Sequence, residues 1–298
     1  MSETPSSRAA TVQASGQSGP KTPNTGRIAA RFRELSSRGE LGLVAYVTAG
    51  DPSLDVTEQI VIAAAEAGAD VIELGVPFSD PVADGPTIQR ASERALRVGT
   101  TLAAVIERVR RLRARTQVPL ILFSYFNPIL QMGVEEFVEA AAAAGADGAL
   151  ATDLTLEESC EYRAAMHARG LDTVFLAAPT STDGRIAKIA ECSSGFLYLI
   201  SRTGVTGTRE ALPEDLPALA RRVRRFTKLP LAVGFGISRP EHVSVLGGIA
   251  DAAVVGSAIV AEIEKAPTAK EAVTNVARLI GALKDAARSG ISQRSPGA

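Results

Sequence analysis

The chain has 298 residues, of which 46% are hydrophobic, and its formal net charge is −1. This length and apolar content allow a full buried core, and the balanced charge gives no overall attraction to nucleic acid or to a membrane surface. Two cysteines and two histidines argue against a disulfide framework and against a zinc site, and no apolar run reaches membrane-spanning length. We therefore expect a cytoplasmic protein without a metal.

Residues 1–24 are rich in Ser, Thr, Gly, Pro and Gln and lack helical or strand periodicity. This composition is typical of a flexible tail, and the segment has no apolar stretch of the kind found in secretory signals. We predict a disordered tail over 1–24, a catalytic domain over 25–290 and a frayed C-terminus over 291–298.

From residue 28 onward, helical stretches rich in Ala, Glu, Leu and Arg alternate with short β-branched runs. A helix over 28–37 precedes the first strand. The strands are expected at 43–48, 71–72, 120–125, 148–151, 173–176, 196–200, 231–234 and 252–255, and the later helices at 54–67, 101–115, 134–144, 156–169, 184–191, 213–226, 239–247 and 258–288.

About eight β–α units over about 260 residues match the count of a (β/α)8 barrel, or TIM barrel. Ala-Gly-Ala-Asp recurs at 67–70 and 144–147, with Gly-Gly-Ile-Ala-Asp at 247–251, as a repeated turn from helix to strand requires. A doubly wound open sheet is the competing α/β fold, but no G-x-G-x-x-G opens a first helix. We predict a single barrel with an extra N-terminal helix.

The stretch ELGVPFSDPVADGPTIQ at 73–89 holds the strongest candidates for chemistry. Glu73 lies where the second strand is expected to end, and Asp80 and Asp84 follow in a loop that contains several prolines. Burying a carboxylate beside apolar residues costs several kcal/mol unless the group is paired, protonated or used. A lone acid could face solvent, but a second acid in the same stiff loop favours a catalytic pair.

Glycine-rich segments follow the last three expected strands, at 201–207, 234–238 and 256–258. Glycines let backbone N–H groups approach phosphate oxygens, and helix N-termini at Ser238 and Ser257 would add positive dipole ends. Barrels often bind phosphate with the loops after strands seven and eight. Ordinary serine-capped turns explain each segment alone, whereas the combination favours a phosphate site.

Lysine is missing from the ends of all the expected strands, which argues against a Schiff-base aldolase. Carboxylates without a lysine or a cluster of metal ligands leave proton transfer as the chemistry. Another phosphate-binding barrel, such as a sugar-phosphate isomerase or epimerase, is an alternative at this point.

Four segments carry a specific resemblance: ELGVPFSDPVADGPTIQ at 73–89, SRTGVTG at 201–207, GFGIS at 234–238 and GSAIV at 256–260. They closely resemble the tryptophan synthase alpha chain family, and the match runs in order from about residue 27 to 288. The resemblance implies a (β/α)8 barrel and a lyase of tryptophan biosynthesis. In that family the barrel cleaves indole-3-glycerol phosphate to indole and glyceraldehyde 3-phosphate by a retro-aldol step.

Carried over by this resemblance, Glu73 is the general acid/base and Asp84 hydrogen-bonds the indole N–H. Thr206, in the sixth loop, is the residue that touches Asp84 when the loop closes. Position 46 is Tyr where some relatives carry Phe. The implied substrate contacts are Tyr46, Tyr125, Tyr198, Phe235 and Thr206, and the implied phosphate contacts are Gly207, Gly236, Gly256 and Ser257.

The resemblance also implies a partner, a beta chain that holds pyridoxal phosphate, in an alpha2beta2 tetramer through which indole passes directly. The alpha chain itself is expected to bind no cofactor. Candidate contact loops are 51–52, 80–81 and 127–128. A non-catalytic barrel that only activates a beta chain is the alternative, and the Glu73 and Asp84 pair argues against it.

Overall fold

The computed structural model describes residues 26–200, 213–234 and 236–289. The predicted tail over 1–24, the segment 291–298 and the candidates Thr206, Gly207 and Phe235 lie outside the described residues. The described elements are α1 (Arg27–Arg38), β1 (Gly42–Thr48), α2 (Leu54–Glu66), β2 (Val71–Gly75), α3 (Pro86–Arg97), α4 (Leu102–Arg113), β3 (Leu120–Ser124), α5 (Phe126–Met132), α6 (Val134–Ala144), β4 (Gly148–Ala151), α7 (Cys160–Ala168), β5 (Asp172–Thr173), β6 (Leu176–Ala177), α8 (Asp183–Cys192), β7 (Leu197–Ile200), α9 (Leu216–Arg224), β8 (Leu231–Gly234), α10 (Pro240–Val245), β9 (Ala252–Val255), α11 (Ser257–Lys265) and α12 (Ala269–Ser289).

The described strands form one parallel sheet in the order β5-β4-β3-β2-β1-β9-β8-β7-β6. Its two end members, β5 and β6, are separated only by Val174 and Phe175. The Val174 N–H donates to the Ala149 carbonyl of β4 over 3.1 Å, and the Tyr198 N–H of β7 donates to the Phe175 carbonyl over 3.2 Å. A single segment therefore joins both edges of the sheet, and β5 and β6 are two halves of the fifth strand of an eight-stranded barrel.

The (β/α)8 barrel is thus confirmed, with local differences from the predicted elements. The helix expected over 156–169 begins at Cys160, and the long C-terminal helix is two helices separated at Pro267, since proline cannot continue a helix interior. Helix α5 was not predicted. Its Pro128 looks like a helix breaker, but it lies in the first turn, where a missing N–H leaves no bond unmade.

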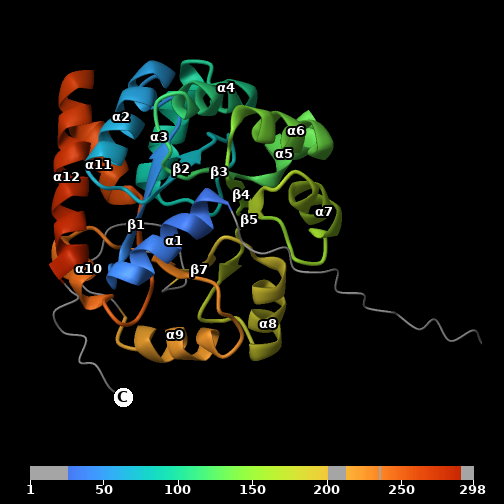
Figure 1. The fold of residues 1–298 in the computed structure, drawn as a ribbon. Helices are drawn as coiled ribbons and strands as arrows, with labels where there is room; N and C mark the ends of the chain where they lie inside the picture. The colour runs from blue at the N-terminus through green and yellow to red at the C-terminus, as the bar shows by residue number, and fades with distance from the viewer. Residues whose placement is uncertain (1–25, 201–212, 235, 290–298) are drawn as a thin grey trace, which may run out of the picture.

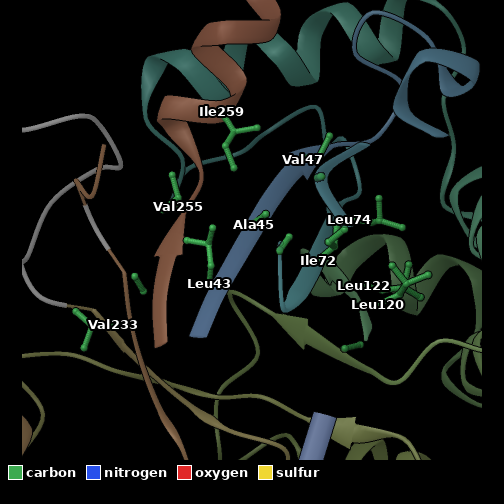
Figure 2. Packing of buried hydrophobic residues seen from close by; sticks show 14 of the residues in the cluster. Leu43, Ala45, Val47, Ile72, Leu74, Leu120, Leu122, Val233, Val255 and Ile259 are labelled. Atoms are coloured by element: carbon green, nitrogen blue, oxygen red, sulfur yellow. The ribbon is translucent and has the colours of Figure 1, made fainter. Parts of the chain in front are cut away.

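Alternate residues of each strand pack outward against the helices, as the two-residue period of a strand requires. This outer core includes Leu43, Ala45 and Val47 of β1, Ile72 and Leu74 of β2, and Ile259 of α11 (Figure 2). Burying a side chain of this size contributes about 1.5–3 kcal/mol. The outer core therefore fixes which residues of each strand are left to face the barrel axis.

The intervening strand residues form a second core inside the barrel, against Ile28, Phe32 and Leu35 of α1. Figure 1 shows α1 lying across the middle of the ring of helices. Because α1 packs with inner-core residues at or near the strand starts, such as Val71 and Ile121, it covers the amino-terminal end of the barrel. Its other members are Val44, Val71, Ile121, Leu150, Val174, Phe196, Ala232, Ala252 and Val254.

Candidate active site

Glu73 is the third residue of β2 and pairs in register with Tyr46 of β1 and Ile121 of β3. Since Ile72 and Leu74 on either side pack outward, Glu73 points into the barrel. The predicted placement at the end of the strand was wrong, because the strand continues to Gly75. Glu73 therefore stands inside the carboxyl-terminal mouth of the barrel, directly above the inner core.

The Glu73 side chain is buried without a partner. The residue is 1% exposed, and within the described part of the chain neither carboxylate oxygen has a hydrogen-bond partner. Burial raises the pKa of Glu73 to about 8, because a charged carboxylate loses its hydration there. At neutral pH the side chain is thus mainly a neutral acid with a proton to give.

Asp84 is the second buried acid, in the loop between β2 and α3. Its Oδ2 accepts a hydrogen bond from the Tyr125 hydroxyl over 3.2 Å, and Tyr125 Oη accepts one from the Ala83 N–H over 3.0 Å. Burial raises the pKa of Asp84 to about 6, against a lowering by the Tyr125 bond. At neutral pH Asp84 is mainly ionised. Of the two acids, Glu73 is therefore neutral and Asp84 carries a negative charge.

Two tyrosines connect these acids. The pKa of Tyr46 is raised by burial and then by the charges of Asp84 and Glu73, and the pKa of Tyr198 is raised by burial and then by the same carboxylates. Phe123 packs edge-on against Tyr46, with ring centroids 5.1 Å apart. The structure therefore brings Glu73, Asp84 and the tyrosines into one aromatic-walled site.

Glycines make room for the two tyrosine hydroxyls. A Cβ on Gly75 would lie 2.1 Å from Tyr46 Oη, and a Cβ on Gly234 would lie 2.3 Å from Tyr198 Oη. Sequence reasoning missed both pairings, and it also missed Thr48, whose hydroxyl donates to Tyr46 Oη over 3.4 Å. The available signal was the two-residue period, which puts position 48 on the same face as position 46.

Of the candidate phosphate residues, the described ones, Gly236, Gly256 and Ser257, follow β8 and β9 at the same mouth. Gly236 follows β8 with φ +84°, a conformation that favours glycine, and Gly256 precedes Ser257, the first residue of α11. The N–H groups of the first turn of α11 have no acceptor within the helix, and α11 begins directly after β9, at the carboxyl-terminal end of the strands. A Cβ on Gly256 would lie 3.5 Å from Tyr46 Cβ, which places this segment against the tyrosine pocket.

Within the described ranges, no group of three His, Cys, Asp or Glu side chains could hold a metal ion. In the same ranges, no helix combines the length and apolar character needed to cross a membrane. A neutral acid and an anion lie beside aromatic side chains, and the first turn of α11 begins next to Tyr46. Such a site can move a proton on a flat apolar group that carries an anionic tail.

Comparisons with known proteins agree with this geometry. The family model described as "Tryptophan synthase alpha chain" matches residues 32–288. The tryptophan synthase alpha chain of Solibacter usitatus (strain Ellin6076) is 57% identical over 239 residues, 80% of this chain and 90% of the relative. That of Citrifermentans bemidjiense is 52% identical over 264 residues, 89% of this chain and 98% of the relative.

Solved structures give the same result. Tryptophan synthase from Mycobacterium tuberculosis superposes with a TM-score of 0.82 at 33% identity, covering 88% of this chain and 98% of the other. Tryptophan synthase subunit alpha from Legionella pneumophila str. Paris gives 0.80 at 35% identity, covering 89% and 99%. This chain therefore belongs to the tryptophan synthase alpha chain family.

Proposed function

We propose that Glu73 and Asp84 carry, in this chain, the lyase reaction of its family: retro-aldol cleavage of indole-3-glycerol phosphate to indole and glyceraldehyde 3-phosphate. Glu73 gives its proton to the indole ring carbon that bears the side chain. It then takes the proton of the neighbouring side-chain hydroxyl as the carbon–carbon bond breaks and a carbonyl forms. One proton is returned for each proton given, so Glu73 ends the cycle neutral.

The observation that carries the proposal is the buried, unpartnered Glu73 carboxyl, whose pKa of about 8 keeps it protonated at neutral pH. A general acid works best when its pKa lies near the working pH, because it must both hold and release its proton. A carboxyl with a paired cation in this place would be ionised and could not begin by donating.

Asp84 has the complementary role. Protonation of the indole ring puts positive charge on the ring system, and an ionised carboxylate that accepts the indole N–H stabilises that charge. The Tyr125 hydroxyl at 3.2 Å supports this assignment, because its hydrogen bond favours the ionised form of Asp84. Tyr46 and Tyr198 form walls of the pocket against which a flat ring can pack.

The phosphate end of the substrate is assigned to Gly236, Gly256 and Ser257. Free N–H groups at the start of α11 and the helix dipole favour an anion there, and glycine at 236 and 256 leaves room for phosphate oxygens. The proposal extends to Thr206, Gly207 and Phe235, which the sequence resemblance assigns to loop closure, phosphate binding and the indole pocket.

The proposed partner is a beta chain that holds pyridoxal phosphate, and no cofactor is assigned to the alpha chain itself. The mouth-side loops are the proposed contact surface: Pro52, Asp80 and Asn127 are exposed there, and exposed Val82 and Leu130 add apolar area next to them. Asp51 is buried, so its side chain takes no part in this surface. The free Cys160 and Cys192 support a reducing, cytoplasmic location.

The direct test is to incubate the purified chain with indole-3-glycerol phosphate and to measure indole and glyceraldehyde 3-phosphate, which must appear in equal amounts. Asp84→Asn is expected to lower kcat by about 100-fold, because the amide oxygen still accepts the N–H but carries no charge. Asp80→Asn, on an exposed residue of the same loop, is the matched control and should keep the wild-type rate.

The assay is repeated with a beta chain present. Indole formation in either condition supports the lyase function. Absence of indole in both, together with stimulation of the beta chain's own reaction, would refute it in favour of a barrel that only activates its partner.

A further inference from the structure

Asp51, Arg94 and Glu264 form a network of ion pairs that joins three elements carrying candidate site residues. Asp51, which follows β1, is 1% exposed, and its two oxygens accept parallel bonds from Nε and Nη2 of Arg94, each 2.8 Å long. The third nitrogen of Arg94, Nη1, donates to Glu264 Oε1 over 2.7 Å. All three donor groups of one guanidinium are therefore used, in the fork geometry that only arginine offers.

Each partner in this network belongs to an element that carries a different part of the site. Asp51 ends the segment that begins with Tyr46 and Thr48 in β1. Arg94 is on α3, which starts two residues after Asp84. Glu264 is on α11, whose first residue is Ser257.

The segments that connect Arg94 and Asp51 to the site residues are held by further contacts. Within α3, Gln89 Nε2 donates to the Asp84 carbonyl over 2.8 Å, which ties the acid to the first turn of the helix. At the end of β1, the Gly50 N–H donates to Thr57 Oγ1 over 2.9 Å, and a Cβ on Gly50 would lie 2.0 Å from Thr100 Oγ1. Neither the Asp51 turn nor the start of α3 can shift without breaking these contacts.

The neighbouring Arg90 shows what an ordinary ion pair looks like here. Arg90 also binds Glu264 with two bonds of 2.7 Å, but its side chain is 49% exposed and, among the described residues, it makes no hydrogen bond or ion pair with Asp51. Exposed pairs of this kind contribute little, because water screens them. Arg94 differs in that it connects to the buried Asp51, so its bonds lie partly out of solvent.

We propose that Arg94 is a positioning residue, which sets the Asp84 loop and the phosphate end of α11 relative to the tyrosine wall of β1. The inference rests on the proposed function. The bond to Asp51 fixes α3, and with it Asp84, against β1. The bond to Glu264 fixes α11, and with it the N–H groups at Ser257. Because small misplacements of reacting groups are costly in rate, each bond should have its own kinetic effect.

Steady-state kinetics of indole-3-glycerol phosphate cleavage test the two bonds of Arg94 separately. The bond to Asp51 is called the α3 arm, and the bond to Glu264 is called the α11 arm. Asp51→Asn weakens the α3 arm and should lower kcat about tenfold while KM changes less than about twofold. Glu264→Gln weakens the α11 arm and should raise KM about fivefold, and raise the inhibition constant of inorganic phosphate equally, while kcat stays within about twofold. Arg94→Met should show both effects.

Arg94→Lys and Arg90→Gln complete the set. Lysine keeps the charge but cannot hold both carboxylates, so Arg94→Lys should recover only part of either loss. Arg90→Gln should match the wild type in kcat and KM. Melting temperatures of all variants are recorded, since a purely structural role would lower them without separating kcat from KM.

The outcomes distinguish this inference from the proposed function. An active wild type whose Asp51→Asn and Glu264→Gln variants lose kcat and KM in the same proportion, or whose Arg94→Lys variant behaves like Arg90→Gln, overturns the positioning role. A wild type that forms no indole alone or with a beta chain contradicts the proposed function instead. In that case the inhibition measurement is replaced by a binding titration with inorganic phosphate. Weaker phosphate binding to Glu264→Gln than to Asp51→Asn supports the α11 arm.

Discussion

Buried carboxylates occur at both ends of the barrel, but their surroundings differ. At the amino-terminal end, Asp70 Oδ2 accepts the Leu43 N–H over 2.7 Å and the Lys284 ammonium over 2.8 Å, while its Oδ1 accepts from Arg31. At the carboxyl-terminal end, both oxygens of Glu73 are without a partner. The two residues are three positions apart along the chain, and each is 1% exposed.

The amino-terminal arrangement is repeated around the barrel. Asp147 accepts the Leu120 N–H over 2.8 Å and pairs with Arg113 over 2.7 Å, and Asp251 accepts the Leu231 N–H over 2.7 Å and pairs with Arg224. In each case the Asp before one strand accepts the N–H of the first or second residue of the preceding strand.

The difference shows that burial alone does not give a carboxylate its role. An acid whose oxygens accept bonds from a strand N–H and from basic side chains holds neighbouring strands of the barrel together. An acid that is buried without partners costs stability, and such a cost persists where the group serves a reaction. The amino-terminal aspartates therefore hold strands together, whereas Glu73 keeps a carboxyl that the proposed function can use.

The largest expected effect is on catalysis, from the substitution Glu73→Gln at the carboxyl-terminal mouth of the barrel. The amide has the shape of the acid but no exchangeable acidic proton, so kcat for indole formation should fall at least about 1,000-fold. Substrate binding should persist, because Glu73 is not assigned to the indole or phosphate contacts. Equilibrium binding of indole-3-glycerol phosphate to the variant checks this second point, and retained turnover would remove Glu73 from the mechanism.

The next largest effect is on stability, from the substitution Asp70→Asn at the amino-terminal end of the barrel. The change leaves Lys284, which is 2% exposed, without its closest counter-charge, and it should lower the free energy of unfolding by about 3 kcal/mol. Urea unfolding measures this loss, and kcat of the folded variant should equal that of the wild type. The double variant Asp70→Asn/Lys284→Met should recover part of the stability, since it removes the unpaired buried charge. A loss of kcat at full stability would contradict the structural assignment.

Glu73 and Asp84 could be chosen as candidates from the sequence, because an acid next to an apolar strand and a second acid in a proline-rich loop are local patterns, and the structure buries both. The barrel could also be predicted, from the regular alternation of helical and β-branched stretches. The difference between Asp70 and Glu73 could not. It depends on Lys284, which is 214 positions away from Asp70, and no local pattern announces such a pairing.

The same reason explains the other misses. Asp51 looked like part of an exposed contact loop, and its burial depends on Arg94 of α3. The fifth strand is divided because Asp172–Thr173 pairs with β4 while Leu176–Ala177 pairs with β7. This division results from closure of the barrel, and no pattern within the strand's own sequence predicts it. The space for Tyr46 at Gly75 likewise comes from the register between two strands.

A smaller effect sharpens the comparison through the pH dependence of stability. The pKa of Glu73 is raised from 4.5 to about 8 in the folded chain, so between those pH values the folded state holds a proton that the unfolded state releases. Stability from this source is fully present below about pH 4.5 and is lost as pH rises toward 8. Between pH 6 and pH 8 the wild type should lose about 2 kcal/mol that Glu73→Gln does not lose. Urea unfolding at the two pH values measures the difference, and parallel losses in both proteins would show that Glu73 is ionised throughout.

The smallest effect concerns Asp84, which is intermediate between the two cases because it is buried and, among the described residues, accepts a side-chain hydrogen bond from Tyr125 alone. Removing that donor with Tyr125→Phe leaves burial unopposed, so the pKa of Asp84 should rise further above its ordinary value. If ionised Asp84 is required, the acid limb of the kcat/KM profile moves to higher pH, and kcat/KM near pH 6 falls about tenfold while the value at pH 8 changes little. Tyr162→Phe is the matched control, because the Tyr162 hydroxyl on α7 is also buried but has no hydrogen-bond partner among the residues that the structure describes, and it lies outside the site. An acid limb that moves equally in both variants, or in neither, would mean that the Tyr125 bond does not set the charge state on which the reaction depends.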